Sequence, residues 1–238
     1  MNTEMNSEDR IAQLERMLDE LQSKEQIRDV MHRYARSVDR CDIEGLKACY
    51  WEDGWDDHGF FGGNAHEFAD YVIPILEQAE SSIHQISNEI IELDGDRAFT
   101  ECYWQVLHRL PKGDEFLDYM HEGRYLDVFE RRHGTWKIYT RTIVGDSDRL
   151  FQVADLKALM VEGAKAIGMT GEIYEPHAIG RRAPADLVFK KEEFVNFINK
   201  NRDAVEDFWA PFIAMAPILQ SRWKQHILRL TNRLRRKR

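Results

Sequence analysis

The segment SSIHQISN, at positions 81–88, places a histidine between two isoleucines. Its alternation predicts a strand in which His84, Ile86 and Asn88 share one face and Ile83 lies on the other. A face that mixes one apolar side chain with two polar ones suits the lining of a pocket. A lone strand histidine is more often a structural residue, so proton transfer by His84 requires a partner.

The segment RYARSVDRCD offers that partner, because it places Tyr34 and Asp39 five residues apart near the end of an amphipathic helix. A carboxylate that accepts the Nδ1–H of an imidazole fixes the tautomer and raises the basicity of the ring. Asp39 could hold His84 in this way and leave Nε2 free to take a proton. By itself, Asp39 could equally be a solvated or helix-capping carboxylate.

His108 lies on the strand expected to pair with that of His84, and it shares a face there with Trp104 and Val106. Two histidines on adjacent strands can flank one substrate, or they can belong to different ends of the sheet. We therefore count His108, Trp104 and Val106 as candidate substrate-binding residues, together with Asn88.

Arg141 stands between apolar residues in the segment IYTRTIV. An arginine in that position needs a buried partner or an anion, because unpaired burial of its charge is costly. Arg141 is therefore a candidate pocket residue. The alternative is a salt bridge at the edge of the sheet, with Asp127 as a partner.

Metal and nucleotide sites find little support. Asp56, Asp57 and His58 are adjacent, and neighbouring loop residues are poor tetrahedral ligands. The chain has no H-x-x-x-H or H-x-E signature, no G-x-G-x-x-G loop and no Walker lysine motif. The sequence predicts a site without a metal or a cofactor.

The charge distribution argues against nucleic acid as a partner. The formal net charge of the 238 residues is −9, although the segment 222–238 carries eight Lys or Arg and no acid. An acidic body repels phosphates, and the acidic surface of the chain itself or of a neighbouring subunit is the expected partner for the basic amphipathic tail. No apolar run approaches the ~20 residues of a membrane span. With three unpatterned cysteines and a polar start, the chain is expected to be cytoplasmic.

A change of hydrophobic period organises the chain. Three helices are predicted first, and four long antiparallel strands follow, over the ranges 8–38, 43–50 and 65–80, then 83–93, 97–110, 119–131 and 135–144. This order predicts an α+β fold, with a curved sheet around N-terminal helices. Residues 1–150 form this domain, and residues 151–238 form a mostly helical extension that is not an independent domain.

Over residues 8–148, these segments and the block GRYLDVFERRHGTWKIYTR resemble the SnoaL-like branch of the NTF2-like superfamily, which folds as a cone-shaped barrel. Within it, the chain looks like the cofactor-free lyases: bile-acid 7α-dehydratase, hexachlorocyclohexane dehydrochlorinase and scytalone dehydratase. The resemblance implies catalytic roles for Tyr34, Asp39 and His84, with His108 and Arg141 in the pocket. It also suggests a homotrimer.

One residue departs from the family pattern. Where the bile-acid enzyme has an acid on the strand after the hairpin, this chain has Val106. Protonation of the leaving group then falls to Tyr34, His108 or Arg141.

The substrate expected from the resemblance is a hydroxylated aromatic or alicyclic small molecule. We favour deformylation of a lignin-derived diarylpropane to a stilbene, an aromatic catabolic step, with Phe208, Trp209 and Phe212 as a lid. The alternatives are a dehydratase, an isomerase, a polyketide cyclase, or a ligand-binding or assembly module without catalysis.

Overall fold

The computed structural model describes residues 6–113, 115–152 and 182–190. Those up to 152 and those from 182 to 186 belong to one compact unit, and those from 187 to 190 to another. The predicted tail helices and the proposed lid residues Phe208, Trp209 and Phe212 lie outside the described residues. The boundary at residue 150 stays a prediction.

The first unit contains the three predicted helices and the four predicted long strands, with two further strands between the second and third helices. Its helices are α1 (Ser7–Arg40), α2 (Ile43–Ala48) and α3 (Ala65–Leu76). Its strands are β1 (Tyr50–Asp57), β2 (Gly62–Asn64), β3 (Ser81–Asp94), β4 (Arg97–Lys112), β5 (Glu115–Arg132) and β6 (Thr135–Gln152). A short 3-10 helix, Leu187–Phe189, belongs to the second unit.

Local signals set the ends of α1. The side chain of Asn6 accepts the backbone N–H of Asp9 at 2.9 Å, which satisfies one of the free donors of the first turn. At the other end, Cys41 takes a left-handed conformation with φ of 52°, and its N–H returns to the carbonyls of Ser37 and Val38. The helix therefore ends at Arg40, close to the end that the sequence predicts, and the carboxylate of Asp39 lies in its last turn.

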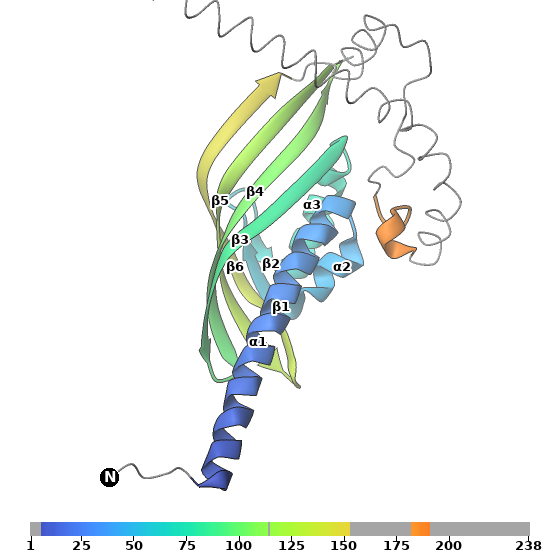
Figure 1. Cartoon of the computed structure of the whole chain (residues 1–238). Coiled ribbons are helices and arrows are strands. Elements are labelled where there is room, and N and C mark those ends of the chain that lie inside the picture. The colour runs from blue at the N-terminus through green and yellow to red at the C-terminus, as the bar shows by residue number, and fades with distance from the viewer. Residues whose placement is uncertain (1–5, 114, 153–181, 191–238) are drawn as a thin grey trace, which may run out of the picture. The chain divides into compact units, whose positions relative to one another are not determined.

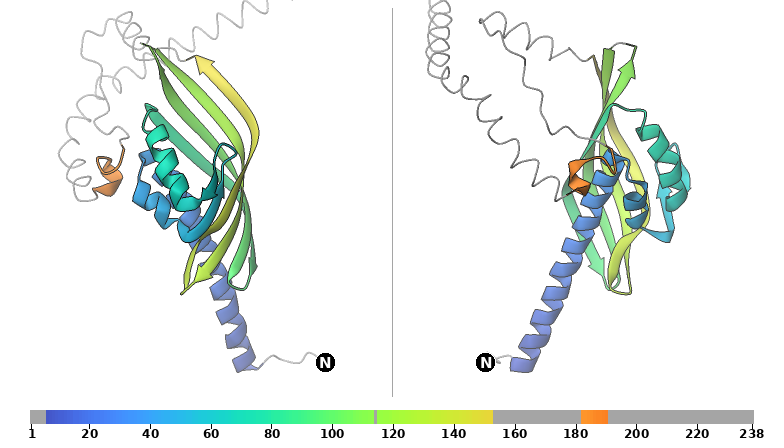
Figure 2. Two further views of the ribbon diagram at one scale, coloured as in Figure 1. Left: turned by 180° about the vertical axis from the view of Figure 1, so that it is seen from behind. Right: turned by 90° about the vertical axis from the view of Figure 1, so that its right-hand side faces the viewer.

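The six strands form one curved sheet in the order β2-β1-β6-β5-β4-β3. Strand β1 runs parallel to β6, and the other neighbours are antiparallel. Figures 1 and 2 show α1, α2 and α3 on the concave side of this sheet. The α+β class and the cone-like arrangement are as predicted, with a sheet that stays open.

The core lies between the helices and the concave face of the sheet. The second half of α1 supplies buried apolar side chains, and α2, α3, β1 and strands β4 to β6 supply others. Among the largest fully buried side chains are Tyr34, Tyr50, Phe68, Phe129, Ile27, Met31 and Arg141. The burial of one arginine among these apolar groups marks a polar cluster within the core.

The expected alternation along β3 is wrong at Asn88. The register with β4 shifts between Ser87 and Ile90, and Asn88 has a φ of 55° with an exposed side chain. A bulge of this kind inserts an extra residue and breaks the alternation of faces. Asn88 therefore does not follow His84 and Ile86 on the concave face, and its assignment to substrate binding loses the reason that the sequence offered.

Within the described ranges, none of the helices combines the length and the apolar character needed to cross a membrane.

Candidate active site

Asp39 and His84 meet where the last turn of α1 lies against β3. The carboxylate of Asp39 accepts the backbone N–H of His84, at 3.0 Å from each oxygen. It also lies 2.6 Å from the ring nitrogen Nδ1 of His84. Both side chains are nearly buried, with exposed fractions of 12% and 10%. The structure brings together the two residues that the sequence paired, and catalysis by them is a proposal.

This contact selects one tautomer of the imidazole. A carboxylate oxygen 2.6 Å from Nδ1 accepts a hydrogen bond from an Nδ1 that carries a proton. In neutral His84 the free lone pair is therefore on Nε2. The second hold, on the backbone N–H, fixes the carboxylate relative to the strand. A ring held in this way has Nε2 available as a base, with a negative charge behind it that stabilises the imidazolium.

A row of side chains crosses the sheet beside His84. His84 lies opposite Val106, Val106 opposite His121, and His121 opposite Asp148. Residues directly opposite each other project from the same face of a sheet, so this row lines the concave side. Nδ1 of His121 lies 2.8 Å from Asp148. Val106 itself is buried, with 3% of its surface exposed.

The sequence analysis assigns no role to His121. The structure places it opposite Val106, the residue that departs from the family pattern. Burial lowers the pKa of His121, while the carboxylate of Asp148 opposes this effect. The only signal that could have found it was its register: a histidine on the third long strand, directly across from Val106.

His108 lies one row away, on the same face as Val106. Its Nδ1 is 2.8 Å from the hydroxyl of the buried Ser82, and its ring packs edge-on against that of His84 at 5.8 Å. Burial, together with the positive charges of nearby groups that include His84 and His121, lowers the pKa of His108 to about 4. His108 is therefore a neutral hydrogen-bonding group at neutral pH.

Trp104 forms the floor of this face toward the core. Its ring stacks on Tyr125 at 5.6 Å, and 5% of its surface is exposed. A Cβ on the opposite residue, Gly123, would lie 2.7 Å from the indole ring. The indole therefore occupies the space that a side chain at Gly123 would fill. Its Nε1–H is a buried donor without a hydrogen-bond partner among the described residues.

Arg141 and Asp127 form a buried pair below this floor. Nε and Nη2 of Arg141 donate to the two carboxylate oxygens of Asp127, at 2.8 and 2.7 Å. The guanidinium carbon lies 4.1 Å from the ring centre of Tyr34 and 3.9 Å from that of Tyr125. The alternative drawn from the sequence, a salt bridge from Arg141 to Asp127, has the correct partner. Its expected place at the edge of the sheet is wrong, because β6 lies inside the sheet.

The remaining nitrogen of Arg141, Nη1, is buried and has no hydrogen-bond partner in the described residues. Arg141 is 1% exposed, so this donor could serve only a group that enters the core side of the cone. Substrate binding by Arg141 stays a prediction.

Tyr34 belongs to a second polar chain. Its hydroxyl lies 3.3 Å from Nε2 of His58, whose Nδ1 pairs closely with Asp56, and Asp56 accepts the hydroxyl of Tyr50 at 2.5 Å. No hydrogen bond joins Tyr34 to Asp39 or His84 within the described residues. Burial raises the pKa of Tyr34 against the opposing charge of Arg141, so its hydroxyl stays protonated.

From the sequence, Asp56 and His58 are candidates only as metal ligands. In the structure they form a carboxylate–imidazole pair. His58 stacks on Phe68 at 4.2 Å, and Asp56 is fully buried. In the part of the chain that is described, no three His, Cys, Asp or Glu side chains gather as a metal site.

Arg182 reinforces the ends of two helices behind the Asp39–His84 pair. Its guanidinium donates to the backbone carbonyl of Asp39, and to those of Leu76 and Ala79 at 3.1 and 3.0 Å. Free carbonyls at a helix end need such donors. No periodic pattern marks the segment around Arg182, so its role could not be read from the sequence.

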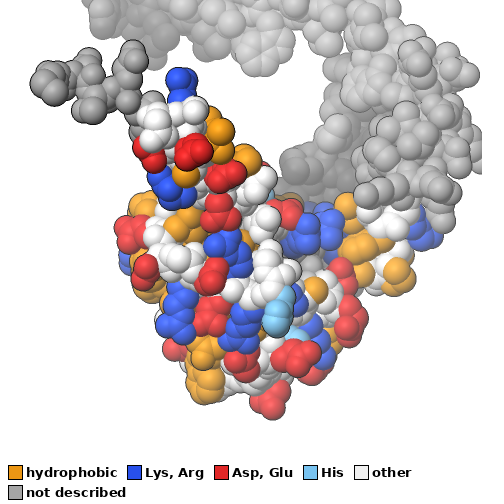
Figure 3. Space-filling model, turned by 90° about the horizontal axis from the view of Figure 1, so that it is seen from below, with side chains coloured by type: hydrophobic (Ala, Val, Ile, Leu, Met, Phe, Trp, Pro, Cys, Tyr) orange, Lys and Arg blue, Asp and Glu red, His pale blue; other side chains and the backbone are white. Residues whose placement is uncertain are grey.

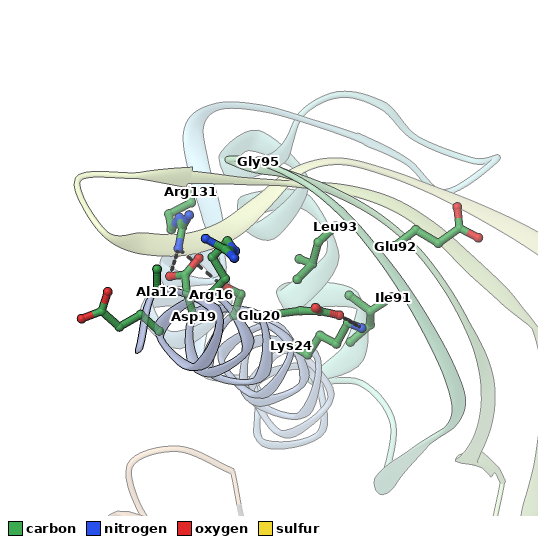
Figure 4. A pocket seen from close by; sticks show the side chains of 12 residues that line it. Ala12, Arg16, Asp19, Glu20, Lys24, Ile91, Glu92, Leu93, Gly95 and Arg131 are labelled. Atoms are coloured by element: carbon green, nitrogen blue, oxygen red, sulfur yellow. Dashed lines mark hydrogen bonds and ion pairs between the residues drawn. The ribbon is translucent and has the colours of Figure 1, made fainter. Parts of the chain in front are cut away.

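A hollow of about 260 Å³ opens beside the pair, lined by Asp39 and other residues of α1 and by His84 and Ile86 of β3. A larger hollow of about 710 Å³ lies elsewhere, between the first half of α1 and the β3–β4 hairpin (Figure 4). No histidine lines the larger hollow, and its walls carry paired charges. The smaller hollow, beside the Asp39–His84 pair, is therefore the better candidate for the active site.

Comparison with known proteins supports one family. A family model described as SnoaL-like domain matches residues 19–142. No curated protein matches the chain.

Similar solved structures include a scytalone dehydratase-like protein of Novosphingobium aromaticivorans, with 20% identity, a TM-score of 0.52 and coverage of 58% of this chain and 93% of that one. A type 2 hexachlorocyclohexane dehydrochlorinase has 20% identity, a TM-score of 0.52 and coverage of 68% and 99%. A type 3 dehydrochlorinase of Novosphingobium barchaimii has 21% identity, a TM-score of 0.51 and coverage of 56% and 93%. At these identities the likeness shows the fold.

Proposed function

Because the chain belongs to the SnoaL-like domain family, we propose that it is a cofactor-independent lyase in which His84, oriented by Asp39, is the general base. The observation that carries this proposal is the double hold of Asp39 on the backbone and ring of His84. A binding module does not need an oriented base, whereas an elimination does. The dehydratase-like and dehydrochlorinase neighbours support lyase-type chemistry.

The proposed substrate is a hydroxylated aromatic or alicyclic small molecule. In a dehydration, Nε2 of His84 takes a proton from carbon, the C–H electrons form the double bond, and the hydroxyl leaves as water after it receives a proton. In a deformylation, the base takes a hydroxyl proton, the adjacent C–C bond breaks and formaldehyde leaves. The electron pair of the broken C–C bond forms the new double bond and expels a benzylic hydroxyl. General-base catalysis of this kind contributes roughly 10²–10⁴-fold.

The leaving oxygen needs a donor, and the contacts favour His108. Its ring lies beside that of His84, and Ser82 holds its Nδ1. A neutral imidazole whose Nδ1 accepts from Ser82 presents an N–H at Nε2, which can stabilise the departing oxygen. The contacts of Tyr34 and Arg141 run within the core instead, so we propose that they support the wall of the site.

Product analysis tests this function. The protein is incubated without added cofactor with aromatic 1,2- and 1,3-diols, including a diarylpropane diol, and products are identified by mass. Loss of water indicates dehydration, and release of formaldehyde with a stilbene indicates the deformylation that we favour. An isomer or a ring-closed product of unchanged mass would favour an isomerase or a cyclase, and binding without any product would favour a ligand-binding module.

Assembly and location are part of the same proposal. We propose a homotrimer in the cytoplasm that has no membrane or nucleic-acid partner, and sedimentation of the purified chain with and without DNA tests the assembly.

A further inference from the structure

The first half of α1 extends past the sheet. We call Ser7–Gln22 the arm; Figure 1 shows it running beyond the β3–β4 end of the sheet toward the N-terminus, and the right-hand view of Figure 2 agrees. Its large apolar side chains are exposed to between 52% and 65%: Ile11, Leu14, Met17, Leu18 and Leu21. Figure 3 shows hydrophobic side chains on the surface of this projecting helix.

The sheet of the same chain contacts the opposite, polar side of the arm. Arg131, on β5, donates to Asp19 at 2.7 Å and to Ser23 at 3.3 Å. Figure 4 shows Arg131 and the hairpin residue Leu93 directed toward this polar side, across the larger hollow. The sheet therefore reaches α1 through charged and polar groups here.

The apolar stripe of the arm points away from the core. At 100° per residue, the stripe of Ile11, Leu14 and Leu18 lies roughly 150° around the helix from the core-facing stripe of Ile27 and Met31. The two stripes look continuous in the sequence, but they lie on nearly opposite sides of one helix. The barrel that covers the second stripe cannot also cover the first.

The spacing of the exposed stripe is that of a coiled coil. Ile11, Leu14, Leu18 and Leu21 are separated by three, four and three residues, which makes them positions a, d, a and d of two heptads. Isoleucine at the first a position with leucine at both d positions favours two strands. The helix is already formed by its docked second half, so the short seam does not have to nucleate it.

The flanking charges select the partner and its direction. The e and g positions hold Glu8 and Glu15 against Arg10 and Lys24, so a purely basic partner gains nothing there. In a parallel pair, Arg10 at g faces Glu15 at e of the other helix. In an antiparallel pair, Glu15 would face its own copy and Arg10 would face Lys24. The seam is therefore self-complementary in the parallel direction only.

We propose that the arm forms a parallel, two-stranded coiled coil with the arm of a second copy of this chain. The contact is separate from the Asp39–His84 site, and it joins two copies through their N-terminal helices whatever contacts their barrels make.

The molar mass of the full chain, measured by light scattering after size exclusion, tests the contact. Leu14→Glu with Leu18→Glu should halve the mass, from hexamer to trimer where the barrels form the proposed homotrimer and from dimer to monomer where they do not. It should also raise the dissociation constant of the arm contact at least ~100-fold, since four leucines lose burial in each pair. The matched control is Gln13→Glu with Gln26→Glu, which adds the same charge at exposed positions outside the seam and should keep the mass. An unchanged mass in the seam variant, with or without a lower melting temperature, would refute the proposal, because the stripe would then be uncovered or covered within its own chain.

Two further variants test the direction. Leu14→Cys should give a disulfide-linked pair on mild oxidation, and Gln13→Cys should not, since the native Cys41, Cys49 and Cys102 are buried. Arg10→Glu should weaken the pair, and adding Glu15→Arg should restore it. Failure of Leu14→Cys to cross-link above the Gln13→Cys control, or failure of the charge swap to restore the mass, would rule out the parallel coiled coil.

Discussion

Asp39 binds His84 twice, through the backbone N–H at 3.0 Å and through ring nitrogen Nδ1 at 2.6 Å. One carboxylate thus joins the last turn of α1 to β3 and sets the tautomer of the imidazole at the same time. A purely structural carboxylate would need only the first contact. The second contact has a consequence for chemistry, because it leaves Nε2 as the basic atom of the ring.

The pKa of His108 predicts how stability depends on pH. Burial lowers this pKa to about 4, from an ordinary value of 6.5, so the unfolded chain binds a proton that the folded chain refuses between these values. The contribution of neutral His108 is complete above pH 6.5 and is lost as the pH falls toward 4, by up to about 3 kcal/mol.

His108→Gln should therefore reduce the difference in unfolding free energy between pH 7 and pH 4.5, measured by urea denaturation. Comparing two pH values within one variant cancels any loss of packing. An undiminished difference would show that His108 is not the group that titrates.

The Asp127–Arg141 pair predicts a strong dependence between two substitutions. Asp127→Asn leaves the guanidinium buried without its counter-ion and should cost about 3–5 kcal/mol of unfolding free energy in guanidinium chloride. Asp127→Leu with Arg141→Met removes both charges and should recover most of that loss. If the double variant is as unstable as the single one, the pair is not the source of the effect.

Gly123 and Gly145 lie opposite each other on β5 and β6 and make a matched test of the floor of the site. A Cβ at Gly123 would collide with the carbonyl oxygen of Val144 and come within 2.7 Å of the Trp104 ring, whereas nothing lies within 4 Å of a Cβ at Gly145.

Gly123→Ala should lower stability by about 1–3 kcal/mol and shift the fluorescence of the buried indole, and Gly145→Ala should do neither. Thermal unfolding with tryptophan emission measures both. Equal effects of the two substitutions would contradict the contact between Gly123 and Trp104.

Much of the fold could be predicted because the period of the apolar residues changes once, from about 3.6 to 2, between α3 and β3. The end of α1 beside Asp39 also follows from local signals. The bulge at Asn88 and the parallel pairing of β1 with β6 depend on tertiary contacts that a single strand pattern does not contain. The exposed stripe of the arm and the core-facing stripe of the second half of α1 look like one stripe in the sequence. The short polar break between them does not reveal that they lie on opposite sides of the helix.

The candidate site divides in the same way. His84 and Asp39 could be paired because a lone imidazole needs an orienting carboxylate and the resemblance supplied one. Asp56 and His58 were weighed only as metal ligands, since adjacency in the chain hides their contact with Tyr34. His121 emerges only from the strand register that sets it beside Val106. Arg182 acts from a segment without periodicity.

The central claim is tested most directly by the turnover of a diol substrate in His84→Ala and Asp39→Asn. Each variant should lose roughly 10²–10⁴-fold in kcat with little change in melting temperature, since the carboxamide oxygen that replaces the Asp39 carboxylate can still accept the N–H of His84. The matched controls are His133→Asn, in the exposed β5–β6 turn, and Asp29→Asn, on the exposed side of α1, and both should keep full activity. Full turnover in either His84→Ala or Asp39→Asn would contradict an Asp39-oriented base at His84.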